Sequence, residues 1–69
     1  MNKRLHRINN YRFTIRLCKI AETYGFKTVG KFWDFLDNIP NPNARLTFRT
    51  RHTRVDKLKN ELDKYLKEL

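Results

Sequence analysis

The arginines and lysines are the side chains of this chain most able to bind a ligand. There are sixteen of them against seven acidic residues, which gives a formal net charge of +9. Residues 1–19 hold six of these cations and residues 44–54 hold four, and neither stretch contains an acid. A solubility surface mixes both signs, whereas a polyanion-binding surface concentrates one. Eight of the ten are arginines, whose planar guanidinium fits phosphate and guanine edges, so the pattern predicts a nucleic-acid partner.

The other reactive residue types form no recognisable catalytic or metal site. One cysteine, Cys18, and two histidines, His6 and His52, cannot assemble the usual zinc ligands at a recognisable spacing. Asp34 and Asp37 are an acidic pair on one predicted helix, and a solvated helix face explains them. The chain also lacks a glycine-rich phosphate loop. We therefore expect a protein that is not an enzyme and that uses no metal or cofactor.

Length and composition predict one small domain. The chain has 69 residues, of which we expect 1–10 to form a basic N-terminal arm and 11–69 to form a single nucleic-acid-binding domain. A single cysteine excludes an internal disulfide and fits a reducing compartment. No run approaches the roughly 18 apolar residues of a membrane span, and no signal-peptide pattern is present. These features predict a cytoplasmic protein without a membrane partner, or one acting in the host cytosol if a phage encodes it.

Two segments, 11–17 and 45–51, alternate apolar and polar residues with the period of a half-buried strand. The apolar side of the first segment consists of Tyr11, Phe13, Ile15 and Leu17. A helix is the alternative there, because helical spacing also relates Ile8, Tyr11, Ile15 and Cys18. That helix would turn Phe13 and Leu17 away from its apolar stripe, so the strand is the favoured prediction.

Two short helices are expected after the first strand. The apolar face of the first consists of Leu17, Ile20, Ala21 and Tyr24. Gly25 is a natural end to that helix. Thr28 is placed to cap the second, which runs from Val29 to about Asn38. The prolines and asparagines of residues 38–43 then break the chain.

A C-terminal amphipathic helix closes the chain. Thr53 and Asp56 resemble a capping box that opens it. Its apolar seam consists of Val55, Leu58, Leu62, Tyr65 and Leu69. This seam spans only about two heptads, so we expect a monomer or a weak dimer. The element order is then β-α-α-β-α, which is the order of a small α+β domain with two basic strands packed on helices.

Pairing of the two strands would place their arginines on one outer face. That face would hold Arg12, Arg16, Arg45, Arg49 and Arg51, interleaved with Thr14 and Thr47. Arginines and hydroxyls on one sheet face are suited to tracking a phosphate backbone. The alternative is a solvated strand face without a partner, but no acid balances these arginines nearby.

A helix-turn-helix pattern lies in the middle of the chain. Ala21 would let two helices approach closely, Gly25 would take a positive φ, and Phe26 would plug the corner. The continuation Ile39-Pro-Asn-Pro42, then Leu46-Thr-Phe-Arg-Thr50, then Val55-Asp-Lys-Leu58 resembles the excisionase and MerR-like winged helix-turn-helix proteins. The resemblance covers roughly residues 15–66.

This resemblance implies a winged-helix-like fold and a DNA-binding role. Major-groove contacts would come from Lys27, Thr28 and Lys31, and the wing would carry Arg45, Arg49 and Arg51. It also implies a phage or mobile-element origin, with DNA bending or transcription regulation as the role. The remaining candidate nucleic-acid-binding residues are Arg12, Arg16, Arg54, Lys3, Arg4 and Arg7.

The expected function is therefore a non-enzymatic architectural or regulatory protein that binds nucleic acid through arginine–phosphate contacts. DNA is favoured over RNA, although charge does not separate the two polymers. One alternative is a small RNA-binding protein. The other is a small basic inhibitor or adaptor that binds a protein target, such as a nucleic-acid-processing enzyme.

Overall fold

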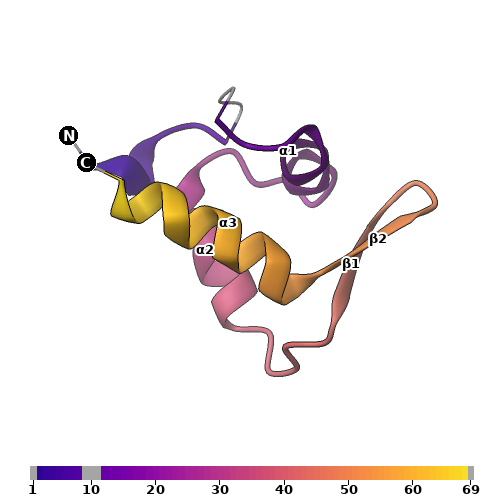
Figure 1. Cartoon of the computed structure of the whole chain (residues 1–69). Coiled ribbons are helices and arrows are strands. Elements are labelled where there is room, and N and C mark those ends of the chain that lie inside the picture. The colour runs from indigo at the N-terminus through magenta and orange to yellow at the C-terminus, as the bar shows by residue number, and fades with distance from the viewer. Residues whose placement is uncertain (1, 9–11, 69) are drawn as a thin grey trace.

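The computed structural model describes residues 2–8 and 12–68 and shows a small α+β protein (Figure 1). Its elements are the 3-10 helix η1 (Lys3–Leu5), α1 (Ile15–Thr23), α2 (Val29–Asp37), β1 (Arg45–Phe48), β2 (Arg51–Arg54) and α3 (Val55–Lys67). The α+β class and the long C-terminal helix are confirmed. The order of the main elements is α-α-β-β-α, and the arrangement is compatible with a winged-helix-like fold.

The predicted strand over residues 11–17 is wrong in the part that the structure describes. Thr14 is the N-cap of α1, and its hydroxyl oxygen accepts a hydrogen bond from the Leu17 backbone N–H at 3.2 Å. The helix therefore begins at Ile15. Phe13 and Leu17 are buried, but Ile15 between them is 79% exposed. The apolar–polar alternation of residues 11–17 does not indicate a strand here, because Phe13 and Leu17 are buried on either side of the N-cap Thr14 without an extended backbone. Tyr11 lies outside the described residues.

The turn between α1 and α2 has the predicted features of a helix-turn-helix. Ala21 is fully buried, Gly25 has a φ of 84°, and the Phe26 N–H donates to the Ala21 carbonyl oxygen at 2.9 Å. Phe26 packs against Phe32, with ring centroids 5.6 Å apart. Thr28 occupies the N-cap position of α2 but makes no side-chain cap hydrogen bond.

The strands form a hairpin that extends away from the helices (Figure 1). β1 pairs with β2 antiparallel, so the predicted pairing with residues 11–17 is wrong. The predicted strand over residues 45–51 is correspondingly divided by a turn at residues 49 and 50. Thr53 is buried in β2 opposite Leu46, and α3 begins at Val55. Thr53 is therefore not the cap of α3, because the chain is still extended there.

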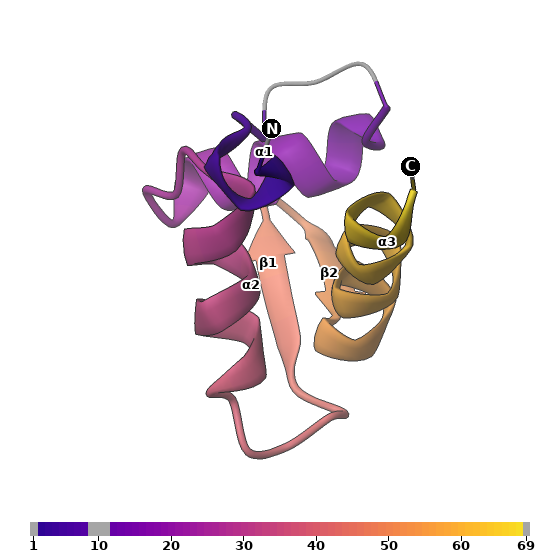
Figure 2. The same ribbon diagram turned by 90° about the vertical axis from the view of Figure 1, so that its left-hand side faces the viewer.

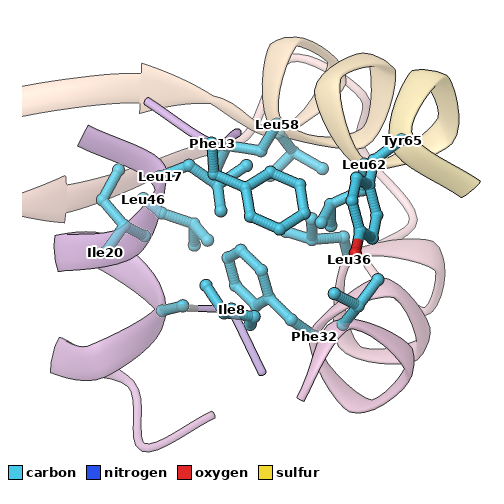
Figure 3. Packing of buried hydrophobic residues seen from close by; sticks show 13 residues of the cluster. Ile8, Phe13, Leu17, Ile20, Phe32, Leu36, Leu46, Leu58, Leu62 and Tyr65 are labelled. Carbon is cyan, nitrogen blue, oxygen red and sulfur yellow. The ribbon is translucent and has the colours of Figure 1, made fainter. Parts of the chain in front are cut away.

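One apolar core joins the three helices to the hairpin. In Figure 2, α2 and α3 lie on either side of the hairpin strands, and α1 lies across the top of the view, above the strands. Figure 3 shows buried side chains from all of these elements meeting in one cluster. The predicted seam of α3 is buried at Val55, Leu58, Leu62 and Tyr65. The last predicted seam residue, Leu69, lies outside the described residues.

Residues 2–8 pack against the helices. Ile8 is 3% exposed, and its N–H donates to the Lys27 carbonyl oxygen at 3.0 Å. The Lys3 ammonium donates to the carbonyl oxygens of Tyr65, at 2.8 Å, and of Glu68 at the end of α3. A cation at this end of a helix is favoured by the helix dipole. This contact fixes the N-terminal segment to α3.

Candidate nucleic-acid interface

Every acidic side chain of the chain is engaged with another group. Six form ion pairs, which are Arg4–Asp34, Arg12–Glu68, Lys19–Glu22, Arg54–Asp56, Lys59–Asp37 and Lys67–Asp63. The seventh, Glu61, accepts hydrogen bonds from the Thr14 backbone N–H at 2.8 Å and from the Thr14 hydroxyl at 3.1 Å. The acids of the chain therefore neutralise only part of its positive charge.

Four of the twelve predicted site residues have side chains held in ion pairs or hydrogen bonds within the protein. These are Lys3, Arg4, Arg12 and Arg54. Arg4 crosses Gly30, where an added Cβ would lie 3.0 Å from the Arg4 Cβ, and its guanidinium reaches Asp34 at 2.8 Å. The Arg54 guanidinium donates to Asp56, and this hydrogen bond lowers the pKa of Asp56 and raises that of Arg54.

Nine cations of residues 2–8 and 12–68 have no acidic side chain within 4.0 Å and make no hydrogen bonds to the end of α3 such as those of Lys3. They are Arg7, Arg16, Lys27, Lys31, Arg45, Arg49, Arg51, Lys57 and Lys64. Seven of these nine are predicted site residues. Lys57 and Lys64 are the two that were not predicted. The predicted site residue Thr28 is half-buried, and its backbone is bridged to Arg7.

A first hollow of about 410 Å³ lies between residues 7–8, α1 and the turn before α2. Arg7, Lys19 and Lys27 line it, and Ile8 and Phe26 contribute apolar surface. The bridge between Arg7 and Thr28 sets Arg7 beside Lys27. Of the three predicted contacts at the start of α2, the structure thus brings Lys27 to this hollow.

A second hollow of about 600 Å³ lies between the start of α1, the hairpin and the start of α3. Its cations are Arg16, Lys19, Arg51 and Lys57. Lys19 lines both hollows, so it connects them across α1. We call the resulting surface the cationic band, and its residues are Arg7, Lys27, Lys19, Arg16, Arg51 and Lys57.

The register of the hairpin divides the predicted arginine face. Arg45 lies opposite Arg54, and Arg51 lies opposite Phe48. Opposed residues share a face and successive residues alternate, so Arg45 and Arg51 are on different faces. The prediction that Arg45, Arg49 and Arg51 share one side is therefore wrong, because the two-residue turn interrupts the alternation. Arg51 faces the second hollow with Phe48.

Sequence reasoning also missed two members of the band. Lys19 belonged to the first basic stretch, but nothing in the sequence shows that it lies between two hollows. Lys57 lies in residues 55–69, where four lysines balance four acids. No sequence signal distinguishes Lys57, because the neutralisation of the preceding Asp56 by Arg54 is visible only once the ion pairs are known.

Arg49, at the tip of the hairpin, has a φ of 57°. A left-handed backbone costs a residue with a Cβ roughly 1–2 kcal/mol, whereas glycine adopts it freely. Arg49→Gly is therefore expected to be more stable than Arg49→Ala by about 1 kcal/mol. Urea denaturation followed by circular dichroism measures this difference. Equal stability of the two variants would show that the turn carries no such strain.

Comparison of the chain with protein-family models, with curated proteins and with solved structures finds no match. Within the described ranges, no three His, Cys, Asp or Glu side chains come together where they could hold a metal ion. None of the helices in that part of the chain is long and apolar enough to cross a membrane. The geometry and charge of the cationic band are therefore the basis for assigning a function.

Proposed function

We propose that this protein binds nucleic acid without catalysing a reaction, using the cationic band and the hairpin arginines. The observation that carries the proposal is the row of cations that crosses α1 from Arg7 and Lys27 through Lys19 to Arg16 and Arg51, of which Lys19 alone has an acidic partner. Two acids line the hollows along this row: Glu22, paired with Lys19 at 3.9 Å, and Glu61, which accepts hydrogen bonds from Thr14. A phosphate backbone supplies a row of negative charges that matches such a band.

DNA is the proposed polymer, and the role is architectural or regulatory. The helix-turn-helix followed by a basic hairpin resembles DNA-binding winged domains, and the strained Arg49 lies at the tip of that hairpin. Strained backbone is retained mainly where function requires it. A chain with one cysteine is suited to the reducing cytoplasm, which we propose as its location.

Removal of two band arginines tests this proposal. Arg16→Ala with Arg51→Ala should lower the affinity for a labelled DNA duplex. The slope of log K against log salt concentration should become shallower by up to about two units, because each lost phosphate contact removes about one unit. Fluorescence anisotropy over a salt series measures both quantities, with single-stranded DNA and RNA of the same sequence run in parallel.

The matched control removes the same charge from the end of α3. Lys64→Ala with Lys67→Ala lies outside both hollows and should leave the slope close to that of the wild type. Equal slopes for all three proteins would reject the band as the interface. Tighter binding of RNA than of DNA in every variant would reassign the polymer.

A further inference from the structure

The second hollow has apolar surface at its centre as well as charge around it. We call it the α1–hairpin groove. Ile15 lines it and is 79% exposed, although it is a large apolar residue at the first position of α1. Phe48 is half-buried on the hairpin wall, and Leu58 lies at the base. A groove of about 600 Å³ is within the size range of ligand sites.

The charge around this apolar surface is almost entirely positive. Arg16, Arg51 and Lys57 line the groove without an acidic partner among the described residues. The one acid that lines it is Glu61, whose carboxylate accepts the hydrogen bonds from the backbone N–H and the hydroxyl of Thr14. This carboxylate forms no ion pair with Arg16, Arg51 or Lys57, so these three cations keep their charge available for a ligand.

The start of α1 also lies at the groove, because Thr14 and Ile15 line it as the N-cap and first residue of that helix. A helix N-terminus carries a partial positive charge, and the Glu61 carboxylate on Thr14 offsets part of it. The start of α3 adds nothing, because Asp56 lies in its first turn and Val55 lines a different hollow. The preference for an anion therefore comes mainly from the charged side chains of the groove.

We infer that the α1–hairpin groove binds an acidic segment of a protein partner that carries a large apolar side chain. The carboxylates would face Arg16, Arg51 and Lys57, and the apolar side chain would cover Ile15 and Phe48. A protein–protein interface commonly has this arrangement, with an apolar centre and a charged rim. A duplex backbone offers charge and small sugar C–H groups but no large apolar side chain to cover Ile15, which favours the protein segment over nucleic acid.

This inference extends the proposed function but does not depend on it. Arg16 and Arg51 belong to the cationic band as well as to the groove, so an acidic segment and DNA would compete for them. Ile15 belongs to the groove alone. A change at Ile15 therefore separates the two activities.

The test uses two synthetic peptides made of aspartate and glutamate. One has a Leu-Phe pair at its centre, and the comparison peptide has Ser-Ser there. Fluorescence anisotropy should show that the full chain binds the Leu-Phe peptide about tenfold more tightly, because burial of one large apolar side chain contributes about a tenfold change in affinity. Ile15→Ser should remove most of that advantage and leave the affinity for the Ser-Ser peptide unchanged.

The matched control is Leu5→Ser, which changes another exposed apolar residue, 74% accessible, outside the groove. It should bind both peptides like the wild type. Its circular dichroism spectrum is the reference for the folding of Ile15→Ser. Equal affinity for the two peptides in the wild type would overturn the inference. An equal effect of Ile15→Ser and Leu5→Ser would do the same.

The DNA arm of the experiment distinguishes the two proposals. Ile15→Ser should leave duplex affinity unchanged. If it weakens DNA binding as much as Leu-Phe peptide binding, then the groove serves nucleic acid and the inference fails. If the chain binds no DNA but binds the Leu-Phe peptide in an Ile15-dependent way, the proposed function fails while the docking groove stands.

Discussion

Leu62→Ala is expected to lower the free energy of unfolding by about 2–4 kcal/mol. Leu62 is fully buried in α3, in the cluster drawn in Figure 3. Its truncation removes apolar contacts and leaves a cavity that close-packed neighbours fill only partly. A domain of 69 residues buries a smaller fraction of its surface on folding than a larger domain does, and it is only marginally stable. The loss should therefore be visible as a large shift of the urea midpoint.

Leu66→Ala is the matched control because it makes the same chemical change on the same helix. Leu66 is half-buried beside the core, so its loss should cost about 1 kcal/mol. Equal costs at the two positions would contradict the packing described for α3. A tight dimer at micromolar concentration would also contradict it, if Leu62→Ala dissociates that dimer before unfolding. The apolar seam of α3 would then serve association. Sedimentation equilibrium separates these cases.

The elements that the sequence predicted correctly are those with a repeated helical period. α3 keeps its apolar spacing over more than three turns, from Val55 to Tyr65, and α2 has a continuous apolar face with a turn glycine before it. These patterns survive because tertiary packing uses the same face that the period defines. The proline-rich break was equally clear, since proline and asparagine fit neither regular structure.

β2 could not be predicted, because its four residues, Arg51–Arg54, include no large apolar residue. Its extended backbone is set by pairing with β1 through a two-residue turn. Such turns are usually recognised by glycine or asparagine, but here the left-handed position is occupied by Arg49. Without that signal, the alternation over residues 45–51 predicts one strand that pairs with a distant segment.

The candidate site was predictable in its chemistry but not in its geometry. Segregated charge identified Arg16 and Arg51, and the structure brings both to one hollow. The neutralisation of Arg4 by Asp34 joins residues 30 positions apart, so no local pattern reveals it. The division of hairpin arginines between two faces likewise depends on a register that the turn sets.

Phe13→Ala is expected to cost about 3–5 kcal/mol, whereas Ile15→Ala should change stability by less than about 0.5 kcal/mol. Phe13 is 5% exposed, and its ring centroid lies 4.7 Å from that of Tyr65 on α3. Ile15 is 79% exposed at the start of α1, where alanine is also the better helix former. A strand over residues 11–17 would instead bury both side chains on one face.

Urea denaturation of the two variants decides between the helix start and the strand, because the two arrangements predict different ratios of the stability lost at position 13 to that lost at position 15. A helix that begins at Ile15 predicts a large loss at position 13 and almost none two residues later. Comparable losses of more than about 1 kcal/mol at both positions would restore the strand, since burial of an isoleucine side chain contributes about 1.5–3 kcal/mol. If residues 11–17 do not form a strand, Ile15 does not belong to the core. Ile15 can line the groove inferred for an acidic partner only because it is exposed.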